Sequence, residues 1–145
     1  MPEEEEKLDE KEAVRRLNLA LELQYRSALQ YSIAASSLSG IEAQALGSKL
    51  TEFGDSELAD ARRLIEKIVS FDGKPTTAVA ELRYEKSAKK ALKWLAKCEE
   101  AAVEALQESI EPTGRDGRSE ALEHLMEHLI LRKQAQVDFL NRAIS

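Results

Sequence analysis

Residues that interrupt helices divide this chain into four long segments. The 145 residues include only 6 Gly and 3 Pro, and the stretches between the breakers are rich in Ala, Leu, Glu, Lys, Arg and Gln, which favour helices. The pattern predicts helices at about residues 9–38, 42–71, 87–111 and from 119 almost to the end, with Ser119 as the N-cap of the last one. No segment alternates with the period of a strand, so the sequence predicts an all-α fold.

The lengths of the three connections predict the topology. The first and third have about 3 and 7 residues, so each must join antiparallel neighbours. The middle one, from about Asp72 to Lys86, has about 15 residues and could span ~50 Å when extended at ~3.3 Å per residue. A helix of ~25 residues is only ~37 Å long, so this connection can cross the whole bundle. We therefore predict an antiparallel four-helix bundle made of two hairpins joined by one long crossover loop.

Composition and charge exclude several classes of protein. Much of the formal net charge of -6 lies in the acidic run from Glu3 to Glu12. We expect residues 1–8 to be an acidic, disordered arm before a helical domain at residues 9–145, and the alternative is a tail that binds a partner. No basic patch suggests a nucleic-acid partner, no apolar run approaches the ~18 residues of a membrane span, and the start does not resemble a signal peptide. Cys98 is the only cysteine, which rules out an internal disulfide and favours a cytoplasmic location.

Each predicted helix carries a polar residue near the middle of its apolar stripe. On wheels of 100° per residue, Gln24 lies inside the stripe of the first helix and Glu57 inside that of the second. Glu100 occupies the same place on the third helix, and Lys133 and Gln136 interrupt the stripe of the fourth. A buried charge costs several kcal/mol unless it is paired, so four such helices predict a buried polar site. The alternative is that the stripe edges contact water and the assigned phases are wrong by one residue.

These positions resemble the bacterioferritin family over residues 17–140. Further matches are Gln30-Tyr31 in the first helix, the helix ending at residues 71–75, and residues 137–140 in the last helix. The resemblance implies a ferritin-like fold. In that family six ligands hold two irons that react with dioxygen: Glu from the first and third helices, and Glu-x-x-His from the second and fourth.

Most of these ligand positions are altered. In chain order they hold Gln24, Glu57, Asp60, Glu100, Lys133 and Gln136. The resemblance therefore leaves Glu57 and Glu100 as family ligands, and Asp60 could bind metal although it is shorter than His. Glutamine is a poor iron ligand, and Lys133 places a cation where cations should bind. The family's haem-binding Met is replaced by Leu58, so we expect no haem.

Three hypotheses for function follow. The first is a non-enzymatic protein without a cofactor, in which Lys133 stands in for the metal and the role is structural, regulatory or that of an interaction module. The second is a protein that binds, stores or oxidises iron or another divalent metal through Glu57, Asp60 and Glu100. The third is a carrier that holds a small ligand in the bundle interior, which requires an apolar cavity of several hundred Å³.

The first predicted helix is apolar on two sides. Leu19, Leu29 and Ile33 lie ~140–180° from Gln24, where a solvent-facing helix should be polar. The bundle can cover only one side, and a large exposed apolar strip is unusual for a monomer. We therefore predict a symmetric homodimer that forms through this helix, as the resemblance to bacterioferritin also implies.

Overall fold

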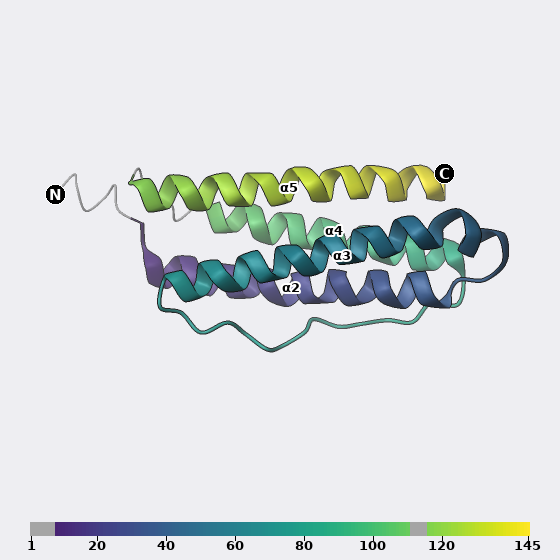
Figure 1. The fold of residues 1–145 in the computed structure, drawn as a ribbon, viewed down its shortest axis with the longest axis horizontal. Coiled ribbons are helices and arrows are strands. Elements are labelled where there is room, and N and C mark those ends of the chain that lie inside the picture. Colours follow the sequence, from purple (N-terminus) through teal and green to yellow (C-terminus); the bar gives the residue numbers. More distant parts are fainter. Residues whose placement is uncertain (1–7, 111–115) are drawn as a thin grey trace.

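The computed structural model describes residues 8–110 and 116–145, without the side chain of Glu42. The predicted acidic arm therefore lies outside the described residues except for Leu8. The described chain forms four helices: α2 (Glu10–Ser37), α3 (Gly40–Ser70), α4 (Ala88–Ile110) and α5 (Gly117–Ile144). They lie side by side as one elongated bundle with no strand in the described ranges, which confirms the predicted fold class (Figure 1). No helix in this part of the chain is long and apolar enough to cross a membrane.

Two aspartates fix the starts of α2 and α5. The side chain of Asp9 accepts a hydrogen bond from the Glu12 amide at 3.1 Å and caps α2. Asp116 caps α5 by accepting from the Ser119 amide at 2.8 Å, so the prediction that Ser119 is the N-cap was wrong by three residues. Asp116 also accepts from the Leu8 amide at 3.3 Å. These hydrogen bonds, the one from Ser119 first, lower the pKa of Asp116 below its ordinary value.

The connection between α3 and α4 runs along the whole bundle beside α2 (Figure 1). It leaves α3 at Asp72, whose φ of 59° lies in the left-handed region that polar residues such as Asp tolerate. The next residue, Gly73, has no room for a side chain, because a Cβ atom there would lie 2.6 Å from a methyl carbon of Val14 in α2. The predicted long crossover is therefore confirmed, and this tight turn starts it.

Two side-chain amides of α2 hold the crossover in place. Asn18 donates to the carbonyl of Lys74 at 3.0 Å and accepts from the amide of Thr76 at 2.8 Å. Gln30 binds Arg83 in the same way, donating to its carbonyl at 3.0 Å and accepting from its amide at 2.6 Å. Each amide therefore satisfies one backbone donor and one backbone acceptor of the crossover.

The apolar core is split into two clusters. One surrounds Leu17, Leu64 and Met126 near the start of α2, and the other surrounds Tyr31 and Phe53 near its end. The Tyr31 and Phe53 rings pack edge to face with their centroids 5.7 Å apart. The polar residues described below lie between these clusters, at the middle of the bundle.

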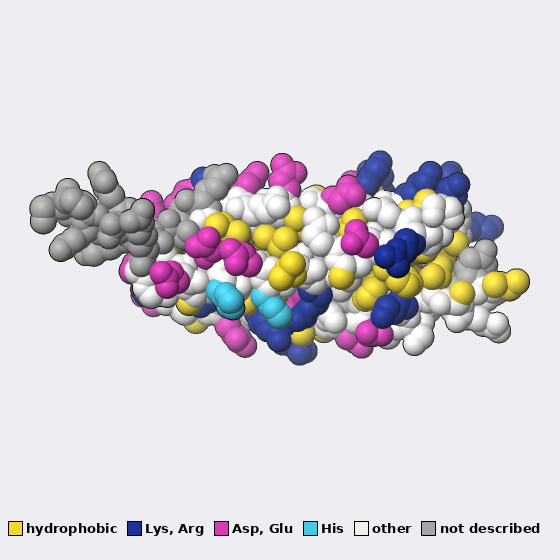
Figure 2. All heavy atoms as spheres, turned by 90° about the horizontal axis from the view of Figure 1, so that it is seen from above, with side chains coloured by type: hydrophobic (Ala, Val, Ile, Leu, Met, Phe, Trp, Pro, Cys, Tyr) yellow, Lys and Arg dark blue, Asp and Glu magenta, His cyan; other side chains and the backbone are white. Residues whose placement is uncertain are grey.

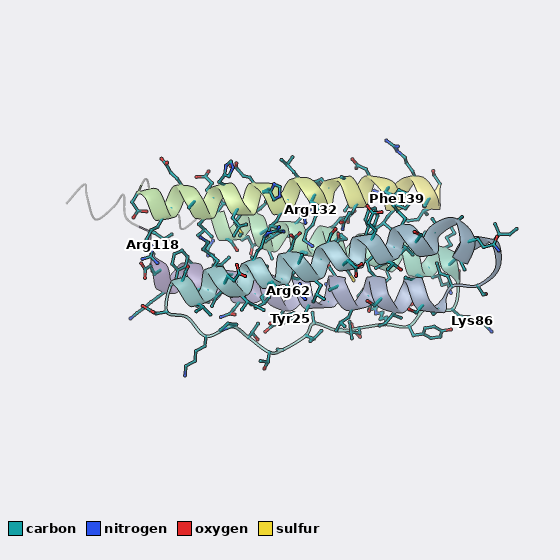
Figure 3. The ribbon with its side chains drawn as sticks, in the orientation of Figure 1. Tyr25, Arg62, Lys86, Arg118, Arg132 and Phe139 are labelled. Atoms are coloured by element: carbon teal, nitrogen blue, oxygen red, sulfur yellow. The ribbon has the colours of Figure 1, made fainter. Side chains whose placement is uncertain are left out.

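The second apolar side of α2 is only partly covered. Leu23 and Tyr25 pack against the core, and the Tyr25 hydroxyl donates to the carbonyl of Thr76 in the crossover at 3.0 Å (Figure 3). Leu19 and Leu29 remain 48% and 43% exposed. The crossover thus covers part of the strip that the sequence analysis assigned to a second subunit, and the homodimer stays a prediction.

Candidate functional site

All four helices contribute a polar side chain to one buried cluster. The cluster consists of Gln24 from α2, Glu57 from α3, Glu99 from α4, and Lys133 and Gln136 from α5. The first four are 0% exposed and Gln136 is 2% exposed. Such complete burial of three ionisable groups requires that they compensate one another.

Lys133 is the centre of this cluster. Its Nζ lies 2.5 Å from Oε2 of Glu57 and 3.1 Å from Oε1 of Glu99. Burial opposes the charge of the ammonium, but the carboxylates of Glu99 and Glu57 outweigh it and raise the pKa of Lys133 above its ordinary value. Lys133 is therefore a cation held between two carboxyl groups.

Together with the contacts of Lys133, the remaining hydrogen bonds give every carboxyl oxygen of the two glutamates a partner. Gln136 donates from Nε2 to Oε1 of Glu57 at 2.6 Å and to Oε2 of Glu99 at 2.7 Å. Gln24 donates to the Glu57 carboxylate and to its backbone carbonyl, the latter at 2.8 Å. The Tyr31 hydroxyl donates to Oε2 of Glu99 at 3.2 Å. A complete set of donors of this kind specifies one arrangement of the buried groups.

The cluster has one cation and two carboxyl groups, so full ionisation would leave it negative. Burial is the largest influence on Glu99 and, with the nearby Glu57, raises its pKa to about 8 despite the attraction of Lys133. For Glu57 the attraction of Lys133 and the hydrogen bonds outweigh burial and lower the pKa. The raised pKa of Glu99 and the lowered pKa of Glu57 both favour an ionised Glu57–Lys133 pair beside an uncharged Glu99, which would balance the charge of the cluster.

The structure corrects the assignment of the third helix. Glu100 is exposed on the outer face of α4, and Glu99 takes its expected place in the core. The family spacing led to the error, because Glu99 and Lys133 are 34 positions apart rather than the expected 33. The buried Leu95, Ala102 and Leu106 centre the apolar face of α4 on Glu99, and this pattern could have identified it from sequence.

Asp60 is buried but belongs to a separate interaction between α3 and α5. Its Oδ1 accepts hydrogen bonds from Arg63 at 2.6 Å and from Arg132 of α5 at 2.9 Å. Its Oδ2 is buried and has no hydrogen-bond partner among the described residues. Burial raises the pKa of Asp60 although Arg132 opposes the shift. Asp60 thus links the two helices instead of completing the central cluster.

This set of residues does not fit a pair of iron ions. The ammonium of Lys133 occupies the space between Glu57 and Glu99, where a bridging ion would need to lie. Gln24 and Gln136 point their amide N–H groups at Glu57, and these groups donate hydrogen bonds and cannot coordinate a cation; the amide oxygen of Gln24 is buried without a hydrogen-bond partner among the described residues. In the described part of the chain, no three His, Cys, Asp or Glu side chains are grouped so that they could hold a metal.

The family is shown by the sequence as a whole. Residues 14–145 match the ferritin-like domain family. The chain belongs to the ferritin-like family. No curated protein sequence gives a significant match to this ferritin-like chain.

Solved structures with the same fold include those of three bacterial proteins. A ferritin-like, diiron-carboxylate protein from Bacillus anthracis str. Ames has a TM-score of 0.88 and 23% identity, over 94% of this chain and 98% of its own. The bacterioferritin of Rhodobacter capsulatus, with a metal-free dinuclear site and a haem iron, has a TM-score of 0.79 and 21% identity, over 95% and 86%. A bacterioferritin-related dodecameric thioferritin from Bacteroides fragilis has a TM-score of 0.83 and 18% identity, over 94% and 86%. At these identities the likeness establishes the ferritin-like fold.

Proposed function

We propose that this ferritin-like chain works without a di-iron centre, as a structural, regulatory or interaction protein. The observation that carries the proposal is the buried ammonium of Lys133 between Glu57 and Glu99. In a di-iron bundle, metal ions neutralise the carboxylates that four helices bring together. Here one lysine and one bound proton supply that neutralisation, so the bundle is complete without metal.

Electrostatics argues against metal entering this cluster. A divalent ion ~4 Å from the ammonium would be repelled by roughly 8 kcal/mol at an effective dielectric constant of 20. Binding would also require Gln24 and Gln136 to turn their N–H groups away from Glu57. Lys133 would therefore have to leave or lose its proton before a metal could bind, and its raised pKa opposes that loss.

The alternative is a protein that binds iron or another divalent metal. The buried, unpartnered Oδ2 of Asp60 favours this alternative, because such an oxygen could coordinate a cation. Glu57 and Glu99 would supply the other ligands, in place of the predicted set that included Glu100. We favour the first proposal, because Arg63 and Arg132 already neutralise Asp60 and Lys133 already neutralises Glu57.

Metal analysis and ferrous oxidation test the proposal. We expect purified protein to contain no stoichiometric metal, and to consume no oxygen above the buffer rate when ferrous iron is added. The control is a restored variant with Gln24→Glu, Asp60→His, Lys133→Glu and Gln136→His, which together with Glu57 and Glu99 supplies six family-type ligands and should gain metal affinity. Stoichiometric iron with rapid oxygen uptake by the wild-type protein contradicts the proposal. A folded restored variant that binds no metal means that the positions are aligned wrongly.

We also propose that the chain forms a homodimer through the exposed side of α2. An apolar hollow of about 290 Å³ lies beside Leu29, and its lining consists of Tyr25, Ala28, Leu29, Leu58, Thr77 and Val79. At 1 M ionic strength, where charge-charge contacts are screened, Leu29→Asp should shift the protein from dimer to monomer in light scattering, because it places a charge in the apolar contact. Leu131→Asp, at a position 71% exposed on α5, is the matched control. A wild-type monomer at micromolar concentration contradicts this dimer.

The free, buried Cys98 supports the cytoplasmic location expected from the sequence.

A further inference from the structure

The outer face of α4 has an ordered distribution of charge. The exposed positions of this helix are, in chain order, Lys89, Lys90, Lys93, Lys97, Glu100, Glu104, Gln107 and Glu108. Every lysine therefore precedes every glutamate, and they form one stripe because they recur at spacings of three and four residues. Figure 2 shows Lys and Arg side chains along the half of the molecule away from the N-terminus, and a further group of them at mid-length beside the His side chains. We call this set of eight residues the α4 stripe.

The order of charges is unfavourable within a single chain. The positive end of a helix dipole lies at the N-terminus, where the α4 stripe has its lysines, and the negative end lies where it has its glutamates. Like charges also follow one another at the i, i+4 spacing, for example Lys89 with Lys93 and Glu100 with Glu104, which destabilises a helix. No charged residue of the stripe forms an ion pair within the described part of the chain. Such conflicts are expected where a surface serves a function.

The same order is favourable against an antiparallel copy of itself. Lys97 and Glu100 lie equally far on either side of the midpoint between residues 98 and 99. The same is true of Lys93 with Glu104, and of Lys89 with Glu108. A two-fold axis through this midpoint would therefore bring three of the four lysines opposite a glutamate of the other copy, and Lys90 opposite Gln107. From this symmetry we infer that α4 is an isologous docking surface for a second copy of this chain, packed antiparallel through the α4 stripe.

This arrangement removes both conflicts at once. Lys89, Lys93 and Lys97 each gain an opposite charge across the axis, and the two helix dipoles run in opposite directions. Six ion pairs result, because each of the three residue pairs occurs twice about the axis. The contact uses charged side chains of α4, so it is separate from the apolar contact proposed for α2 and does not depend on it.

Other occupants use only half of the stripe. A nucleic acid or an acidic protein would bind the lysines and be repelled by Glu100, Glu104 and Glu108, whereas a basic partner would be repelled by the lysines. The stripe contains no apolar side chain, and individual exposed ion pairs are weak. The contact should therefore be weak and sensitive to salt, since the Debye length falls from about 10 Å at 0.1 M to about 3 Å at 1 M ionic strength.

Charge-reversal variants test this surface, in a Leu29→Asp background that removes the contact proposed for α2. The first variant carries Lys89→Glu, Lys93→Glu and Lys97→Glu, and the second carries Glu100→Lys, Glu104→Lys and Glu108→Lys. Sedimentation velocity at low salt should show that the Leu29→Asp protein self-associates. Its association constant should fall at least about tenfold in 1 M salt. Each triple variant alone should be monomeric, and an equal mixture should form a one-to-one complex, because all six pairs then join opposite charges.

Zero-length carbodiimide cross-linking of a mixture of ¹⁴N and ¹⁵N chains tests the antiparallel arrangement. Lys93–Glu104 and Lys89–Glu108 cross-links should join a light chain to a heavy chain. Within one helix these pairs are about 16 Å and about 28 Å apart, too far for a direct amide bond. Three results overturn the inference: a Leu29→Asp protein that stays monomeric at low salt, a mixture of the two variants that does not associate, or cross-links between copies that avoid these pairs. Circular dichroism confirms that each variant is folded.

Discussion

The substitution Lys133→Met probes the central cluster most sharply. Methionine has a similar length and no charge, so the change removes the ammonium while it keeps the packing volume. Glu57 then loses the ion pair at 2.5 Å, whereas Glu99 loses less because its raised pKa keeps it protonated at neutral pH. One uncompensated carboxylate would remain in the core.

The magnitude follows from the burial of this pair. Removal of one partner of a buried ion pair costs roughly 3–5 kcal/mol, and Lys133 and Glu57 are both 0% exposed. For a domain of this size, each kcal/mol lowers Tm by about 2–4 °C. Without Lys133, burial should raise the pKa of Glu57 above its ordinary 4.5, so the variant should be most stable below that value and should lose stability as pH rises. The loss relative to wild type should therefore shrink as pH falls from 7 to 5, by at most about 1.4 kcal/mol per pH unit.

Urea denaturation followed by circular dichroism at pH 7 and pH 5 measures both effects. Lys11→Met is the matched control, because Lys11 is an exposed residue of α2 and its loss should change the free energy of unfolding by less than about 0.5 kcal/mol. A Lys133→Met variant that loses less than about 1 kcal/mol at pH 7, or whose loss does not depend on pH, would refute the reasoning.

Three further predictions concern single positions. Glu99→Gln should gain stability relative to wild type by about 1.4 kcal/mol per pH unit as pH rises from 4.5 to about 8, because the wild-type protein loses the stability that comes from the protonated Glu99 through that range. Urea titrations at several pH values measure this difference in the free energy of unfolding. Parallel curves of stability against pH for the two proteins would contradict the raised pKa. Gly73→Ala should lower the free energy of unfolding by about 1–3 kcal/mol through its clash with Val14, and Val14→Ala in the same chain should recover part of the loss. A double variant that loses as much as the two single variants together would exclude that clash as the cause. Asp116→Ala should cost about 1 kcal/mol as an N-cap of α5, which thermal denaturation can measure, and an unchanged Tm would leave the capping role without support.

The fold could be predicted from the sequence because its main signals are local. Breakers fix where α2, α3 and α4 begin and end to within about three residues, and loop length decides the crossover. The start of α5 was misplaced because Asp116 and Ser119 are both good N-cap residues and only the folded chain shows which one accepts the amide hydrogen bond.

The candidate site was harder to predict in detail. Gln24, Glu57, Lys133 and Gln136 could be placed in the core because each lies on an apolar stripe. Glu99 was missed because it is adjacent to another glutamate, and the family spacing favoured Glu100. The two arginines on Asp60 come from different helices, so no local pattern could indicate that this carboxylate was already paired.

The order of charges in α4 is visible in the sequence, but its meaning depends on the fold. The periodicity of Lys89, Lys93 and Lys97 is typical of a solvated helix face, and the acidic net charge of the whole chain does not indicate this local group of lysines. Only the structure shows that these lysines and the following glutamates share one exposed face with no internal ion-pair partners among the described residues.

Anomalous diffraction at the iron edge tests the central claim most directly. Crystals of the wild-type protein and of the four-substitution restored variant would be grown with ferrous iron without oxygen, and their maps compared at the middle of the bundle. We predict no anomalous peak between Glu57 and Glu99 in the wild type, with the Lys133 ammonium in contact with both carboxyl groups, and a peak at that place in the restored variant. A wild-type iron peak at that position, with Lys133 displaced from Glu57, would contradict the claim that lysine has taken the place of the metal.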